Sequence, residues 1–214
     1  MLPILVILAA ALVAGFSLGG SVRPFERLRV HWWPLALAGL ALQAAPSPGG
    51  TLGAALLIGS YVVLIAFALV NRRVAGAWVV VAGLGLNLAV IAPNGGMPVS
   101  AVAIERAGGH GVTVAGDEKH HLMTTMDVMR PLGDVIPVPS PVGAILSIGD
   151  VALYAGLAWF VIAVMLGRSG ANVRPPATVL QMYRGKHLPA RQRLPARYRR
   201  LPDPAAAAMW GSGP

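Results

Sequence analysis

The most regular feature of the chain is a series of long apolar runs separated by short segments that carry charge, proline or glycine. Most of these runs approach the about 20 residues that an α-helix needs to cross a bilayer. The pattern predicts an all-α integral membrane protein whose transmembrane helical domain fills residues 1–167. We expect about five transmembrane helices, over residues 2–18, 32–45, 52–70, 74–92 and 148–166.

The positions of the basic residues predict how these helices are oriented. Arginines cluster after the first run, after the third run and along the C-terminal tail, whereas only Arg106, Lys119 and Arg130 lie between the fourth and fifth runs. Five spans with the N-terminus outside place every cluster in the cytoplasm, where basic loops are expected. The run at 32–45 is short enough to be a re-entrant segment, but without it Arg72 and Arg73 would lie outside.

The first run has no basic residue before it, and arginines follow it at positions 23, 27 and 29. A cleaved signal peptide shows the opposite order, with a charged start before its apolar core. We therefore expect an uncleaved first span.

Composition supports a membrane protein and excludes some chemistry. The chain of 214 residues is 56% hydrophobic and 12% charged, with a mean hydropathy of +0.67. Soluble domains carry about a quarter charged residues. No cysteine is present, so disulfides, thiolate metal sites and cysteine nucleophiles are excluded.

Strongly polar side chains within or beside the apolar runs are candidates for function, because burying them in a bilayer is costly. Several lie toward the predicted outer ends of the helices or in the outer loop at 93–141. We predict a polar pocket there, lined by Gln43, Asn87, Asn94, Asp134 and Asp150.

Three of these positions also have a structural explanation. Ser147 and Asp150 have the spacing of a capping box, in which each side chain bonds the other residue's backbone N–H. Asn87 can form a hydrogen bond between helices. The sequence Asn94-Gly95-Gly96 is typical of a helix C-cap with a left-handed glycine.

Recognised catalytic and metal-binding patterns are missing. The histidines between His110 and His121 lack the HExxH spacing of zinc sites, so a solvated loop is favoured. We predict no catalytic residue, no metal and no cofactor, and a bound lipid is the one non-protein ligand that we expect.

Residues 168–214 form a basic, proline-rich tail that we expect in the cytoplasm. Beside a membrane helix, such a tail favours anionic lipid headgroups or an acidic partner subunit over nucleic acid. The residues expected to make these contacts are Arg184, Lys186, Arg191, Arg193, Arg197, Arg199 and Arg200.

Four stretches together resemble a family of uncharacterised bacterial polytopic membrane proteins. They are Asn87, residues 94–100 (NGGMPVS), residues 133–137 (GDVIP) and residues 147–150 (SIGD). The resemblance extends over residues 2–166. It implies a multi-pass protein of the bacterial cytoplasmic membrane in which the NGGMPVS and GDVIP stretches pack together outside, and it implies no reaction.

The sequence leaves two functions open. The missing catalytic constellation, the small residues on helix faces and the basic tail favour an accessory or scaffold subunit of a larger membrane assembly. The alternative is a transporter or membrane enzyme for a lipid or small solute, with Asp150 as proton carrier or base and Asn87 and Asn94 as orienting groups.

Overall fold

The described part of the chain is mostly helical, as the apolar runs predict. The computed structural model describes residues 2–26, 28–108, 119–168 and 170. Its helices are α1 Leu2–Ser17, α2 Arg23–Glu26, α3 Trp33–Ala44, α4 Gly50–Val70, α5 Ala77–Asn94, α6 Ala101–Arg106 and α7 Ile148–Met165. A 3-10 turn, η1, covers Arg130–Leu132, and the strands are β1 Met97–Val99, β2 His120–Leu122, β3 Ile136–Val138 and β4 Ala144–Leu146.

Three helices in the described part of the chain are long and apolar enough to cross a membrane. They are α4 with 21 residues and α5 and α7 with 18 residues each. Two shorter apolar helices accompany them, α1 with 16 residues and α3 with 12 residues. These helices indicate a membrane protein.

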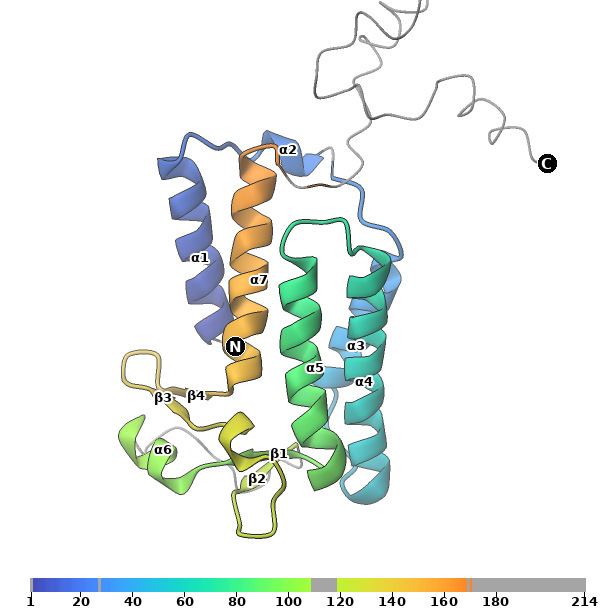
Figure 1. The fold of residues 1–214 in the computed structure, drawn as a ribbon, viewed down its shortest axis with the longest axis vertical. Coiled ribbons are helices and arrows are strands. Elements are labelled where there is room, and N and C mark those ends of the chain that lie inside the picture. The colour runs from blue at the N-terminus through green and yellow to red at the C-terminus, as the bar shows by residue number, and fades with distance from the viewer. Residues whose placement is uncertain (1, 27, 109–118, 169, 171–214) are drawn as a thin grey trace, which may run out of the picture. The chain divides into compact units, whose positions relative to one another are not determined.

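The apolar helices pack in a curved row in the order α1, α7, α5, α4 and α3, with α3 behind α4 and α5 in Figure 1. The α5–α7 pair approaches closely because glycines face each other across it. A side chain at Gly83 would overlap the α7 backbone at Gly149 and Leu153. A side chain at Gly156 would meet Val80 and the Gly76 carbonyl.

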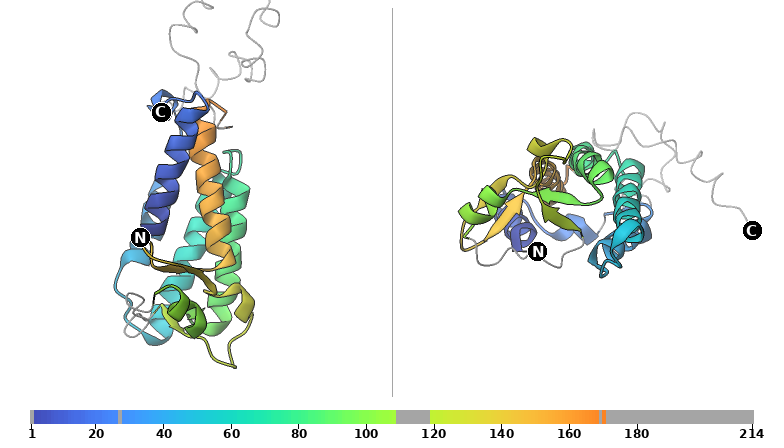
Figure 2. Two further views of the ribbon diagram at one scale, coloured as in Figure 1. Left: turned by 90° about the vertical axis from the view of Figure 1, so that its left-hand side faces the viewer. Right: turned by 90° about the horizontal axis from the view of Figure 1, so that it is seen from below.

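The four strands and α6 lie at the end of this row where α5 ends and α7 begins, which we call the strand end (Figure 1, Figure 2). Strand β1 pairs with β2 in parallel, and β3 pairs with β4 in antiparallel fashion. The sequence predicted a broken polar loop over this part of the chain and did not predict these strands, which are only three residues long.

The NGGMPVS and GDVIP stretches pack together, as the family resemblance implied. The Asp134 N–H donates to the Pro98 carbonyl at 3.0 Å, and the Ser100 N–H donates to the Asp134 carbonyl at 2.9 Å. Beside these two stretches, a buried apolar cluster of Leu57, Val90, Ile91 and Met97 joins α4, α5 and β1. This cluster fixes the strand segment against the helices.

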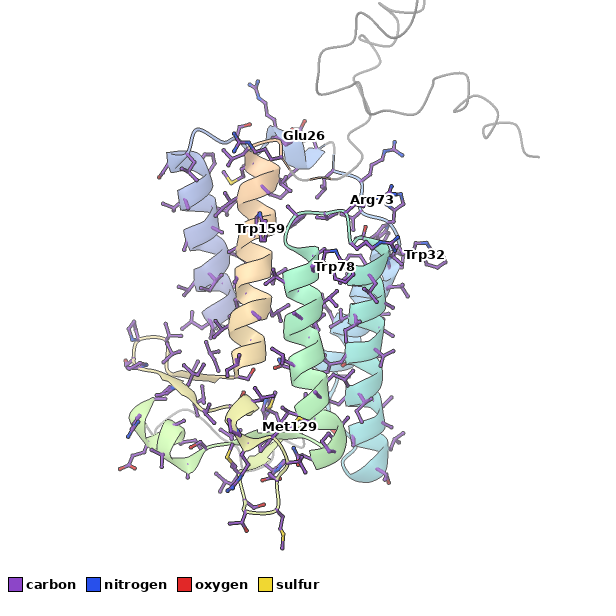
Figure 3. All side chains as sticks on the ribbon, in the orientation of Figure 1. Glu26, Trp32, Arg73, Trp78, Met129 and Trp159 are labelled. Atoms are coloured by element: carbon purple, nitrogen blue, oxygen red, sulfur yellow. The ribbon has the colours of Figure 1, made fainter. Side chains whose placement is uncertain are left out.

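The opposite end of the row, where α4 ends and α5 begins, is the basic end. Figure 3 shows Trp32, Arg73 and Trp78 near this end, far from Met129 at the strand end. Tryptophan and arginine both favour the membrane–water interface. Their placement is consistent with apolar helices that end at an interface here.

Candidate functional site

A cavity of about 390 Å³ lies at the strand end, between the helices and the strands. This volume lies within the range of small-molecule sites, which is roughly 300–1,000 Å³. The cavity is lined by residues of α1, α3, α4, α5 and α7 together with β1, β2 and β4. Its polar side chains are Gln43, Tyr61, Lys119, His120, Asp134, Asp150 and Tyr154.

The Asp150 carboxylate lines this cavity while both of its oxygens are held by the protein. Its Oδ2 accepts from the Ser147 N–H at 3.1 Å, and Ser147 Oγ accepts from the Asp150 N–H at 2.9 Å. This is the predicted capping box, and it is confirmed. The other oxygen, Oδ1, accepts from Asn87 Nδ2 at 2.7 Å. Asp150 is therefore more than a cap, because the same carboxylate joins α7 to α5.

Asn87 is buried at the α5–α7 contact and does not line the cavity. Its Nδ2 donates to Asp150, and its Oδ1 accepts from the Ser147 hydroxyl at 2.8 Å. Gly149 leaves the space that the Asn87 side chain fills, since a Cβ there would overlap its amide oxygen. The amide thus satisfies both polar groups at the start of α7, as the interhelical alternative predicted.

Asp134 has a different environment, because part of its carboxyl is buried without a partner. The residue is 7% exposed, and Oδ1 has no hydrogen-bond partner among the described residues. Its Oδ2 lies 4.0 Å from Nε2 of His120. Burial, and secondly the negative charge of Asp150, raise the pKa of Asp134 to about 8. Its surroundings therefore favour the protonated form of Asp134.

Gln43 lines the cavity from the last turn of α3, and Lys119 lies beside it. The ammonium group of Lys119 donates to the main-chain carbonyls of Gln43 and Ala45, where α3 ends. Carbonyls at a helix C-terminus lack intrahelical partners and favour a cation. Lys119 thereby ties the segment before β2 to α3.

Asn94, like Asn87, is a predicted pocket residue that does not line the cavity. Its Nδ2 donates to the Val90 and Val128 carbonyls at 2.8 and 3.0 Å, and its Oδ1 accepts from the Val128 N–H at 2.9 Å. Gly95 follows with a left-handed φ of 71°, which confirms the predicted C-cap. In this structure Asn94 fastens the loop before η1 to the end of α5.

Sequence reasoning did not place Tyr61, Tyr154, Lys119 or His120 in the pocket, although all four line the cavity. A signal for Tyr154 was present, because it follows Asp150 by four residues and such pairs share a helix face. Lys119 and His120 carried no comparable local signal. They reach the cavity through the pairing of β2 with β1.

Two further sequence predictions concern the histidine-containing segment and the basic tail, which lie partly or wholly outside the described residues. Within the described residues, no group of three or more side chains could hold a metal ion. His121 instead bonds Asp127 at 2.9 Å, and the N–H of Thr124 donates to the same carboxylate. These bonds, led by the one from Thr124, hold the pKa of Asp127 below its usual value. The candidate tail contacts from Arg184 to Arg200, and residues 109–118 of the histidine-containing segment, lie outside the described residues.

Comparison with known proteins identifies the family. Residues 32–162 match a family of unknown function, DUF5317, and because this match covers more than half of the chain, the protein belongs to that family. No curated protein and no solved structure matches the chain. The resemblance to an uncharacterised family is thus confirmed, and it brings no reaction with it.

Proposed function

We propose that this member of the DUF5317 family is a transporter-type membrane protein that binds a small solute in the strand-end cavity and exchanges a proton as it does so. The solute class is a compound with an ammonium or another hydrogen-bond-donating group. The observation that carries the proposal is the Asp134 carboxyl, which is buried, lines the cavity and has one oxygen with no hydrogen-bond partner among the described residues. An unsatisfied buried acceptor is costly, so a ligand donor that reaches it is favoured.

Proton exchange follows from the raised pKa of Asp134. A solute cation near the carboxyl favours its charged form. A carboxyl that holds a proton near pH 7 therefore releases it when a cation binds. Because protonation and cation binding compete for Asp134, solute uptake would be coupled to proton movement in the opposite direction.

Asp150 has a different role in this proposal. Asn87 and Ser147 bind its two carboxylate oxygens, so the Asp150 side chain is held in place at one wall of the cavity. Its charge also contributes to the raised pKa of Asp134. We therefore assign the exchanging proton to Asp134 rather than Asp150, with Asn87 as a positioning residue and Asn94 as part of the fold.

A five-span topology in the bacterial cytoplasmic membrane belongs to the same proposal. Helix α3 rises only about 18 Å at 1.5 Å per residue, against a hydrocarbon core of roughly 30 Å. The chain nevertheless leaves α2 at the basic end and enters α4 at the strand end, so the α3 segment runs between the two ends. Positive-inside orientation then puts the basic end in the cytoplasm and the cavity toward the outside.

Single introduced cysteines test this topology, since the native chain has none. Thr125→Cys at the strand end should react with an impermeant maleimide added to intact cells. Ser21→Cys, between α1 and α2, should react only after the membrane is opened. The reverse pattern refutes the orientation, and labelling of both positions in intact cells contradicts an odd number of spans.

The solute proposal is tested by proton release on ligand binding. The purified protein in nanodiscs is screened against small amines by thermal shift at pH 6.5, and hits are titrated calorimetrically in two buffers of different ionisation enthalpy. We expect proton release on binding to the wild type and none with Asp134→Asn. Glu105→Gln is the matched control, because Glu105 is an exposed acid on α6 that does not line the cavity. Equal proton release from both variants refutes the role of Asp134, and no amine binding refutes the function.

The accessory-subunit function stays a second proposal, supported by two glycines. Gly59 on α4 and Gly85 on α5 have open space where a Cβ would stand. Small residues on membrane helices permit close approach of another helix. If a partner helix packs on these faces, the partner subunit should copurify with the protein from the native membrane. Gly59→Leu and Gly85→Leu should reduce the amount that copurifies. A monomer that emerges alone in mild detergent contradicts it.

A further inference from the structure

A second cavity, of about 280 Å³, lies at the basic end of the helix row. It is formed by the segment that leads into α3, by the end of α4 and its connection to α5, and by Gly170, which follows α7. Residues that line it include Arg29, His31, Trp32, Asn71, Arg72 and Arg73. The start of α3 borders this cavity and the end of α3 borders the strand-end cavity, so the two sites lie at opposite ends of one helix.

The charge of this cavity is strongly one-sided. Arg29, Arg72 and Arg73 all line it, and among the described residues no acidic side chain does. Within the described part of the chain, none of the three guanidinium groups forms an ion pair. Arginine stays charged at any accessible pH. The three side chains are exposed, and their combined charge attracts an anion to the cavity.

The arginines are brought together by a specific contact rather than by chance crowding. Asn71 is buried, and its side chain clamps the backbone of His31 from both sides. The His31 N–H donates to Asn71 Oδ1 at 2.9 Å, and Asn71 Nδ2 donates to the His31 carbonyl at 2.9 Å. The same Nδ2 also donates to the Phe67 carbonyl at 2.9 Å. This clamp fixes the Arg29 segment against the end of α4, from which Arg72 and Arg73 follow.

The surroundings of the cavity match the headgroup layer of a membrane. Trp32 at its rim is 67% exposed, and Trp33 and Trp78 near the same end are 59% and 60% exposed. Figure 3 shows Trp32, Arg73 and Trp78 close to this end of the helices. Exposed tryptophans at the ends of apolar helices mark the membrane–water interface. Helix α3 also begins here, and its N-terminal dipole adds to the attraction for an anion.

We propose that this cavity binds the phosphate group of an anionic phospholipid. Guanidinium groups bind phosphate oxygens through paired N–H donors, which gives strength and a defined geometry. The acyl chains would run along the exposed apolar side chains of α3 and α4, such as Leu37 and Leu69. The proposal does not depend on the solute site, because it uses none of the residues of the strand-end cavity.

Lipid binding to the full chain, tail included, tests the proposal. A short-chain phosphatidylglycerol is titrated into the protein in neutral detergent, and the bound lipid is counted by native mass spectrometry. We expect Arg72→Gln/Arg73→Gln to weaken binding about thirtyfold, from about 1 kcal/mol for each arginine removed. The matched control is Arg23→Gln/Arg168→Gln, which removes the same charge near the same end from residues outside the cavity. An equal loss in the control shows diffuse attraction and overturns the proposal.

Two further variants separate a built site from charge alone and guard against misfolding. Arg72→Lys/Arg73→Lys keeps the positive charge but removes the paired N–H donors of the two guanidinium groups. Asn71→Ala keeps all three arginines but removes the hydrogen bonds that hold the His31 backbone. Both should weaken binding while the protein stays monodisperse, and unchanged binding in both overturns the proposal. Inorganic phosphate is the competitor that separates the sources. If inorganic phosphate displaces the lipid at a concentration equal to that of the lipid, the cavity binds phosphate as such and the lipid proposal is refuted.

Discussion

Ionisation of Asp134 should make the folded protein less stable as the pH rises from about 4 to 8. The pKa of this carboxyl is raised from 3.8 to about 8 by burial and by the Asp150 charge. Between these two values the native state holds a proton that the unfolded state has lost. Stability then falls with pH, by about 1.4 kcal/mol per pH unit for one such group. Below pH 4 both states are protonated and above pH 8 both are ionised, so the effect is confined to this window.

The perturbation that isolates this group is Asp134→Asn. The amide has nearly the shape of the protonated carboxyl and cannot ionise, so its contribution is independent of pH. The full difference between pH 4 and pH 8 is on the order of 5 kcal/mol. Water that enters the cavity on ionisation lowers this total, so the slope around pH 6 to 7 is the quantity to compare. We expect the free energy of unfolding to change less with pH in the variant than in the wild type. Between pH 5 and pH 9 the variant should therefore lose less stability than the wild type.

The assay is reversible unfolding in mixed detergent micelles at pH 5 to 9, followed by tryptophan fluorescence. Glu105→Gln is the control, because this exposed acid should leave the wild-type slope unchanged. A protonated carboxyl should also appear as a C=O stretching band in the infrared spectrum of the wild type, and Asp134→Asn should abolish it. Parallel stability curves for the wild type and Asp134→Asn would refute the reasoning.

Two other predictions use the same unfolding assay. Asn87 and Asp150 should be coupled by about 1–2 kcal/mol in a double-mutant cycle of Asn87→Ala and Asp150→Ala, because their hydrogen bond involves a carboxylate. A coupling within error of zero would mean that the 2.7 Å contact contributes nothing. Gly149→Ala should cost about 1–3 kcal/mol by overpacking, since its Cβ would overlap the Asn87 amide oxygen. Gly85→Ala, where a Cβ meets open space, should change stability by less than about 0.5 kcal/mol, and equal losses in the two variants would contradict the packing.

The sequence by itself determined the features that depend on neighbouring residues. Apolar runs of membrane-spanning length predicted the helical class and the membrane character. The capping box at Ser147 and Asp150 and the left-handed cap at Gly95 were also predictable, because each is formed by residues within four positions of one another. Such patterns act through local backbone hydrogen bonds, so the rest of the fold hardly alters them.

Tertiary structure alone decided what those elements bring together. The strands are three residues long, too short for an alternation pattern, and β1 and β2 pair although residues 100–119 separate them in the chain. That pairing delivers Lys119 and His120 to a cavity that Asp150 enters from a helix. Asp134 is an ordinary loop aspartate in the sequence, and its raised pKa depends on burial by segments distant in the chain. Proximity between distant segments is set by packing, which no local pattern of residues records.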